Sequence, residues 1–318
     1  MYLNQFSEDQ SPLDMTVLAE FESLKQSARD LGINAALNPR YQSRNVVIRS
    51  QRFHFLEWGD PSNPPLVLLH GSNQSAHSWD LVSLNLAANY HVFALDQRGH
   101  GDSEWSRGAH YSVEEMALDL EAFIRSQGIS CPIVVGHSMG GMVTMAFARN
   151  NPDSLAAMVI VDIGSEVNAE GTKMIREFVG RNIEFDDMDE FLDRVVKYDP
   201  YRSREHIERT LKYNLMKRAD GRYVTKHDRR RFLPADDGDR TPIAGAPTLG
   251  ELSRLDIATL IVRGGDSNVL TEESAVRFVG KLMRGQLVTV QECGHNVASQ
   301  NTVGFLSVLK PFLDSLRG

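Results

Sequence analysis

Short apolar runs recur along the chain, and each ends in a glycine or a polar residue. The first four runs are Leu66–Leu69, Tyr90–Leu95, Ile133–Val135 and Met158–Val161. They do not alternate between apolar and polar residues, which is typical of strands buried on both faces, as in a parallel sheet. Stretches with helical spacing separate them, near residues 77–88, 112–127 and 140–150. This succession of strand, helix and strand predicts a doubly wound, mostly parallel α/β sheet.

The sheet pattern stops after Asp162 and resumes about a hundred residues later. Residues 164–246 are rich in charged residues and place apolar residues at helical spacing, which predicts a helical cap. Strands are expected again at Thr259–Val262 and Gln286–Gln291, and a last helix near residues 300–315. We therefore divide the chain into three parts. They are an N-terminal extension at 1–44, an α/β core at 45–163 and 247–318, and a helical cap at 164–246.

The N-terminal extension contains one segment with helical spacing. It runs from Met15 to Gly32, and Gly32 is a natural stop for a helix. We expect this helix to pack on the body of the protein or on a partner subunit. Two short strands should follow it, at Asn45–Ser50 and Phe53–Trp58.

Composition narrows the classes of function. The formal net charge is −8, which disfavours nucleic acid and anionic membranes as partners. The two cysteines, Cys131 and Cys293, belong to no CxxC pair or Cys/His cluster, so we expect no metal site. No apolar run approaches 18 residues, and the first residues do not resemble a signal peptide. The expected location is the cytoplasm.

The strongest chemical signal is the sequence Gly136-His137-Ser138-Met139-Gly140. It matches G-x-S-x-G, in which a serine occupies a strained turn between a strand and a helix. Here the motif follows the apolar run Ile133–Val135 and opens a helical stretch, which is the context that the motif requires. The sequence therefore predicts Ser138 as a nucleophile.

A second signal, His70-Gly71-Ser72-Asn73, directly follows the run Leu66–Leu69. A backbone N–H in such a loop can join the N–H after the nucleophile to form an oxyanion hole. We assign these two donors to Ser72 and Met139. Substrate contacts are expected from Gly71, His137 and Trp79.

Together these motifs resemble the α/β-hydrolase superfamily, in particular its capped esterase, lactonase and C–C hydrolase branch. Gly294-His295 and the segment from Asp96 to Ser103 add to the resemblance. It implies an eight-stranded sheet with a cap inserted after the sixth strand. It also implies that His295 is the general base and that neither a metal nor an organic cofactor is needed.

The acid of the expected triad departs from the family pattern. Many members place an aspartate third after the glycine that ends a late strand, where this chain has Ser267, with Asp266 one residue earlier. Asp162 ends the run Met158–Val161, and some members of the family use that strand end for the acid. Asp162 is the preferred candidate and Asp266 the alternative.

These residues predict hydrolysis of a small carboxylic ester or lactone through an acyl-enzyme. One alternative is a C–C bond or amide hydrolase for a small carboxylate-bearing substrate, which an arginine in the pocket would favour. Another is a non-catalytic receptor on a hydrolase fold. The expected partner is a small molecule, with a homodimer as an option.

Overall fold

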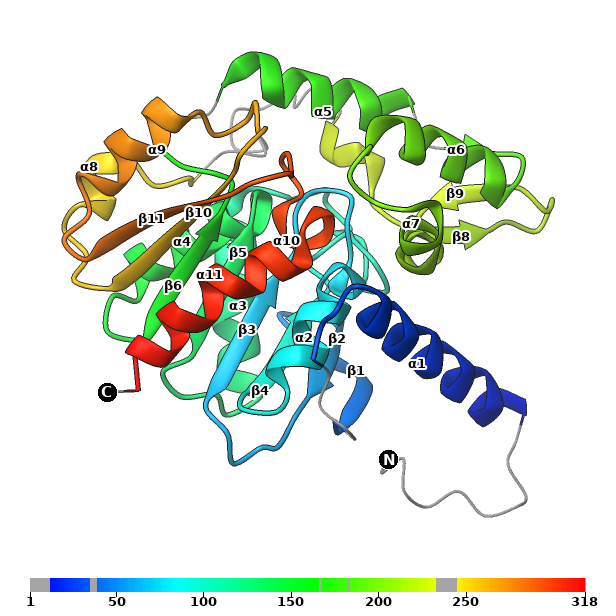
Figure 1. The fold of residues 1–318 in the computed structure, drawn as a ribbon, viewed down its shortest axis with the longest axis horizontal. Coiled ribbons are helices and arrows are strands. Elements are labelled where there is room, and N and C mark those ends of the chain that lie inside the picture. The colour runs from blue at the N-terminus through cyan, green and yellow to red at the C-terminus, as the bar shows by residue number, and fades with distance from the viewer. Residues whose placement is uncertain (1–11, 35–38, 166–167, 182–183, 233–244, 318) are drawn as a thin grey trace.

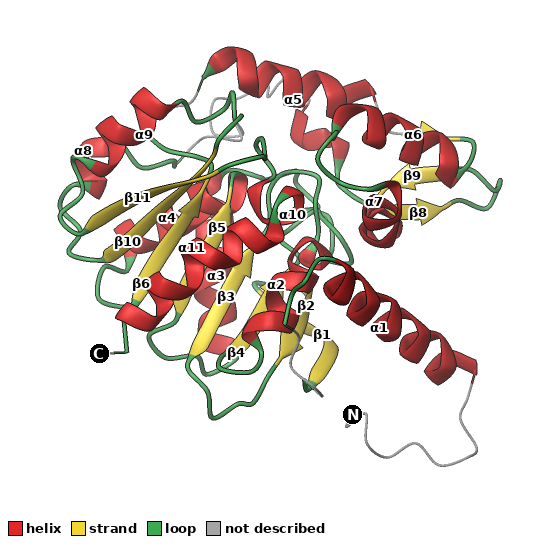
Figure 2. Ribbon diagram, in the orientation of Figure 1, coloured by secondary structure: helices red, strands yellow, loops and turns green. Residues whose placement is uncertain are grey.

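A computed structural model describes residues 12–34, 39–165, 168–181, 184–232 and 245–317. In these residues the chain forms one large sheet with helices on both faces and a separate smaller unit (Figure 1). The smaller unit lies beyond the carboxyl ends of the parallel strands (Figure 2).

The large sheet has eight strands in the order β1-β2-β4-β3-β5-β6-β10-β11. Strand β2 pairs antiparallel with β1 and β4, and the remaining pairs are parallel. This arrangement confirms the predicted doubly wound, mostly parallel sheet. The strands are β1 Tyr41–Ile48, β2 Gln51–Trp58, β3 Pro65–Leu69, β4 His91–Leu95, β5 Ile133–His137, β6 Ala157–Val161, β10 Ala258–Gly264 and β11 Gly285–Val290.

Two hydrophobic clusters cover the two faces of this sheet, because neighbouring residues of a strand point to opposite sides. On β3, Leu66 and Leu68 join one cluster, whereas Val67 and Leu69 join the other. The first cluster includes residues of α1 Pro12–Asp30, η1 Ala76–Trp79, α2 Asp80–Leu86, α10 Val297–Gln300 and α11 Thr302–Ser315. The second includes residues of α3 Val113–Ser126, α4 Met139–Asn150, α8 Leu249–Leu252 and α9 Glu272–Val279.

The segment between β6 and β10 forms a separate unit above the sheet. The sequence predicted a helical cap, but this unit also contains three short strands. It contains α5 Ala169–Arg181, β7 Glu184–Phe185, α6 Met188–Tyr198, α7 Arg204–Leu211, η2 Lys212–Asn214, β8 Leu215–Lys217, β9 Tyr223–Thr225 and η3 Arg229–Phe232. The three strands pair in the order β7-β9-β8. They have two or three residues each, too few to produce an alternating pattern. The turn-forming residues at 234–247 also predict a linker, of which residues 234–244 lie outside the described part of the chain.

Helix α1 confirms the helix expected in the N-terminal extension, and it contacts both the core and the cap. The Phe21 ring stacks on Tyr41 and Trp58 of the core. The Glu20 carboxylate accepts a hydrogen bond from Lys212 Nζ at 3.0 Å and another from Tyr213 in the cap. None of the described helices is both long and apolar enough to span a membrane.

Candidate active site

Ser138 occupies a strained turn between β5 and α4, with φ 51° and ψ −113°. The glycines around it are needed because space is lacking. A Cβ at residue 136 would lie 2.3 Å from the carbonyl oxygen of Gly140, and a Cβ at residue 140 would lie 2.4 Å from that of Leu69. The Ser138 N–H donates to Val161 O, which ties the turn to the neighbouring strand β6. The turn presents the hydroxyl at the carboxyl edge of the sheet.

His295 connects Ser138 to a buried carboxylate. Its Nε2 lies 2.9 Å from Ser138 Oγ, and its Nδ1 lies 2.7 Å from Asp162 Oδ2. Asp162 is fully buried, whereas the His295 side chain is 13% exposed. Nucleophile, imidazole and carboxylate thus form one continuous hydrogen-bonded chain, which is the geometry of a Ser-His-Asp triad.

The structure brings Asp162, and not Asp266, to His295. Asp162 Oδ1 accepts a hydrogen bond from Gly264 N at 2.9 Å, and Ser267 Oγ donates to Oδ2. Ser267 stands where the family pattern places an aspartate, and here its hydroxyl hydrogen-bonds to the Asp162 carboxylate. Asp266 instead accepts a hydrogen bond from the Tyr201 hydroxyl at 3.2 Å.

The two expected oxyanion donors are neighbours. Ser72 Oγ lies 3.8 Å from Met139 Sδ, so the loop after β3 adjoins the first turn of α4. N–H groups in the first turn of a helix have no intrahelical acceptor and are available to a ligand. Gln74 holds the loop, because its Oε1 accepts from Gly71 N at 3.0 Å and its Nε2 donates to Asn296.

His137, the residue before the nucleophile, supports the loop that carries His295. Its Nε2 donates to the His295 carbonyl oxygen at 2.8 Å. Burial and the adjacent His295 imidazole lower the pKa of His137 to about 3, so the ring is neutral. A Cβ at Gly71 would lie 2.6 Å from His137 Nδ1, which explains the glycine there.

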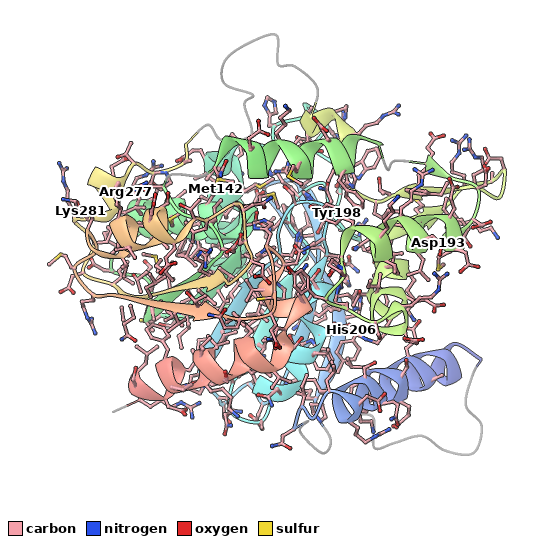
Figure 3. The ribbon with its side chains drawn as sticks, turned by 45° about the horizontal axis from the view of Figure 1, so that its top comes forward. Met142, Asp193, Tyr198, His206, Arg277 and Lys281 are labelled. Carbon is pink, nitrogen blue, oxygen red and sulfur yellow. The ribbon has the colours of Figure 1, made fainter. Side chains whose placement is uncertain are left out.

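A cavity of about 140 Å³ opens at Ser138 between core and cap. The cap supplies an apolar wall composed of Phe178, Val179, Phe191, Val195, Tyr198, Ile207 and Leu211. Tyr198, labelled in Figure 3, stacks on Phe178 at 4.0 Å. The core supplies Ser72, Asn73, Gln74, His137, Ser138, His295 and Asn296. Trp79 is not among the lining residues; its ring is buried against Phe305.

Sequence reasoning missed several polar residues of the cavity. Gln74, Asp199 and Asn214 line it and belong to no recognisable motif, and Asn73, which ends the second signal, was given no role of its own. Nothing in the sequence separates Arg202 from the other arginines and lysines of the cap. It lies 2.7 Å from Asp199 through its Nε, and only the fold brings this pair to the site.

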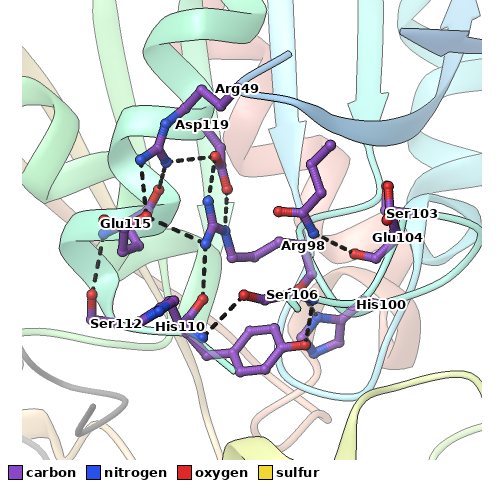
Figure 4. A network of polar contacts seen from close by, with 12 residues as sticks. Arg49, Arg98, His100, Ser103, Glu104, Ser106, His110, Ser112, Glu115 and Asp119 are labelled. Atoms are coloured by element: carbon purple, nitrogen blue, oxygen red, sulfur yellow. Dashed lines mark hydrogen bonds and ion pairs between the residues drawn. The ribbon is translucent and has the colours of Figure 1, made fainter. Parts of the chain in front are cut away.

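The segment from Asp96 to Ser103 acts as a structural support. Arg98 is buried and binds Asp119 of α3, with Nη2 2.6 Å from Oδ1, and it donates to the His110 carbonyl oxygen (Figure 4). Arg49 reaches the same Asp119 carboxylate at 2.8 Å. These contacts fix the loop after β4 to α3, away from the reacting atoms.

One group among the described residues has metal-ligand geometry: His54, Asp96 and Asp102. Protein partners already bind each of them. His54 Nδ1 lies 2.7 Å from Asp96 Oδ2, and Lys226 Nζ lies 2.6 Å from Asp102 Oδ1. None of the three lines the cavity at Ser138, so we assign this group no part in the chemistry.

Fold and site together define a serine hydrolase of the α/β type, and comparison with known proteins agrees. A family model described as the alpha/beta hydrolase fold matches residues 64–302. The chain therefore belongs to the α/β-hydrolase family and is a hydrolase.

Particular relatives cover nearly the whole chain. The esterase Rv0045c of Mycobacterium tuberculosis is 27% identical over 311 residues, 95% of this chain and 98% of that protein. The sn-1-specific diacylglycerol lipase ABHD11 of Mus musculus is 28% identical over 317 residues, 95% of this chain and 94% of that protein. The crystal structure of the mycobacterial esterase covers 98% of this chain and all of its own with a TM-score of 0.73, and at 24% identity this likeness shows the fold.

Proposed function

We propose that this protein hydrolyses a small carboxylic ester or lactone through an acyl-enzyme on Ser138. The observation that carries the proposal is the chain of hydrogen bonds from Ser138 Oγ through His295 to Asp162, beside the cavity that Ser138 and His295 line. Such a chain activates a hydroxyl that is otherwise a weak nucleophile.

In the first half-reaction, Ser138 Oγ attacks the ester carbonyl carbon while His295 Nε2 takes the hydroxyl proton. The carbonyl oxygen becomes an oxyanion, and the N–H groups of Ser72 and Met139 hydrogen-bond to it. The bond to the leaving oxygen then breaks, and His295 returns its proton to that oxygen. Asp162 keeps Nδ1 of the imidazole protonated and stabilises the imidazolium.

In the second half-reaction, a water molecule replaces the alcohol. His295 accepts a proton from this water as it attacks the acyl carbon, and the same oxyanion hole receives the charge. The carbon–Ser138 bond breaks, Oγ regains its proton from His295, and the carboxylic acid leaves. In a lactone the acid and the alcohol are two ends of one product. No step requires a metal or an organic cofactor.

The cavity supports a small acyl group. Its volume of about 140 Å³ and its apolar cap wall suit a short carbon chain. The names of the two relatives, an esterase and a diacylglycerol lipase, also describe ester hydrolysis.

An arginine in the pocket would favour the C–C or amide alternative, and Arg202 lines the cavity. Its charge is compensated, however, because its Nε binds the buried Asp199 carboxylate at 2.7 Å. A substrate carboxylate placed beside Arg202 would also lie beside the negatively charged Asp199. This repulsion favours a neutral ester over a carboxylate-bearing substrate.

A fluorophosphonate probe tests the nucleophile. We expect the wild-type protein to become labelled and Ser138→Ala to remain unlabelled, with Ser307→Ala, an exposed serine on α11, labelled like wild type. A kinetic panel of p-nitrophenyl esters, lactones, amides and vinylogous diketones then tests the bond. Turnover of short esters or lactones supports the proposal. Labelling of Ser138→Ala, or turnover of the diketones or amides alone, contradicts it.

A further inference from the structure

The cavity contains two asparagine side chains with buried, unpaired polar atoms. Asn73 follows Ser72 on the loop after β3, and Asn214 ends η2 in the cap. Nδ2 and Oδ1 of Asn73 and Oδ1 of Asn214 are buried without a hydrogen-bond partner in the described part of the chain. Burial of such atoms costs free energy unless a ligand or water completes their hydrogen bonds.

One of the two amides belongs to the core and the other to the cap, and both line the same cavity. Tyr213, next to Asn214, stacks on His77 with 3.4 Å between ring centroids, and Asp80, which follows η1, accepts from Arg209 of α7 at 3.1 Å. These contacts fix the cap segment around Asn214 against the core segment that follows the oxyanion loop. Asn73 and Asn214 therefore line the cavity from the core and from the cap, respectively.

The chemistry of the unpaired atoms selects the ligand. The two Oδ1 atoms are acceptors and need a donor, whereas Nδ2 of Asn73 is a donor and needs an acceptor. A carboxylate or a ketone can only accept, so it would leave both Oδ1 atoms unpaired. A hydroxyl group can donate to one of the two Oδ1 atoms and accept from Nδ2 of Asn73.

The charge of the cavity points the same way. Arg202 is the one arginine or lysine among the described residues that line it, and Asp199 neutralises it at 2.7 Å. The Asp199 carboxylate is itself fixed by Gln300 Nε2 at 3.1 Å, so it stays beside Arg202. The lining offers no uncompensated cation to an anionic substrate.

We propose that Asn73 and Asn214 recognise a neutral hydroxyl group on the substrate, so that the enzyme prefers hydroxyl-bearing esters over their apolar counterparts. This inference rests on the proposed ester hydrolysis and adds the class of ester. The asparagines determine specificity and take no part in proton transfer.

Matched ester pairs test the inference. In each pair a hydroxyl group replaces a methyl group. Some pairs are p-nitrophenyl esters that differ at carbon 2 or carbon 3 of the acyl chain. Another pair, 2-hydroxyethyl butanoate and propyl butanoate, differs at the end of the alcohol. The p-nitrophenyl monoester of succinate supplies the anionic comparison. We expect at least one hydroxyl ester to exceed its methyl partner about tenfold in kcat/KM.

Two variants locate the preference. Asn73→Gly removes the side chain without strain, because Asn73 has a positive φ of 62° that glycine adopts freely. Asn214→Ala removes the amide contributed by the cap. In these variants the hydroxyl-to-methyl ratio should fall toward one, whereas Asn89→Ala, an exposed asparagine, should keep the wild-type ratio. The ratio is insensitive to a uniform loss of activity from a disturbed loop.

The outcomes separate the two proposals. A ratio near one for every pair in the wild type, a ratio that persists in both variants, or faster turnover of the succinate monoester overturns the hydroxyl inference while ester hydrolysis stands. Failure of fluorophosphonate labelling together with no turnover of any ester overturns the proposed function itself.

Discussion

The core and the cap differ in the size of their sheets and of their buried clusters. In the core, the strands that carry Ser138 and Asp162 are central in an eight-stranded sheet, with a paired strand on either side. The cap has a three-stranded sheet of very short strands and one small cluster of buried residues. That cluster consists of Phe185, Phe191, Leu192, Val195, Ile207, Leu211 and Leu215.

The difference explains where each property of the enzyme resides. Of the buried residues in the cap cluster, Phe191, Val195, Ile207 and Leu211 also line the cavity. The hydrophobic core of the cap thus forms part of the cavity wall. We infer that reaction chemistry depends on the sheet, whereas substrate preference depends on how the cap packs.

The sharpest test of the core is the triad acid. Asp162→Asn should lower kcat by about 10⁴-fold, because the amide would impose the wrong tautomer on His295. Asp266→Asn should change kcat by less than about tenfold, since it alters only one exposed hydrogen bond, which Tyr201 donates. Steady-state kinetics on the best p-nitrophenyl ester measures both. The reverse ranking would assign the acid to Asp266.

Paired core and cap truncations test the difference in stability. Phe55→Ala should lower the free energy of unfolding by about 3–5 kcal/mol, because Phe55 is fully buried in the core among Phe93 and Phe123. Phe185→Ala, in the cap against Phe191, should shift the main unfolding transition less and loosen the cap instead.

Chemical denaturation and limited proteolysis separate these effects. We expect Phe185→Ala to raise cleavage within residues 184–232 and to lower kcat/KM, with the core transition close to wild type. Equal destabilisation of one cooperative transition by both variants would show that cap and core unfold together.

The sequence predicted the core well because its signals are local. Each central strand is a short apolar run that ends in Gly or Asp, and the elbow around Ser138 is specified by five consecutive residues. The cap was less predictable. The spacing of Ile207, Leu211 and Leu215 predicts one helix, but Leu215 begins β8, because strands of three residues leave no periodic pattern.

Among the site residues, contacts between distant segments could not be predicted from the sequence. The place of Asp162 at a strand end favours it as the acid, but its hydrogen bonds to Ser267 and Gly264, about a hundred positions away, appear only in the structure. Trp79 was assigned to the substrate from its sequence position near the oxyanion loop, whereas the fold turns it into the core. The asparagines of the cavity come from distant segments, so no spacing rule joins them.

Acid stability offers a finer comparison of the two regions. Burial, with His295 nearby, lowers the pKa of His137 in the core from 6.5 to about 3. Burial, with Arg202 and Arg209 nearby, lowers the pKa of His206 in the cap to about 3. Between pH 6.5 and about 3 the unfolded chain binds these protons and the folded chain does not, so stability is complete above pH 6.5 and falls as the pH falls.

The two histidines should contribute unequally. Because His137 stays neutral in the folded state, the free energy of unfolding should be about 2 kcal/mol lower at pH 5 than at pH 7. His206, labelled on the cap in Figure 3, is partly exposed, so solvent screening should reduce its contribution to about 1 kcal/mol or less. Urea unfolding at pH 7 and pH 5 measures both through the loss of pH dependence in His137→Gln and His206→Gln. If His206→Gln removed more of the pH dependence than His137→Gln, the cap would exclude water from its histidine more completely than the core does.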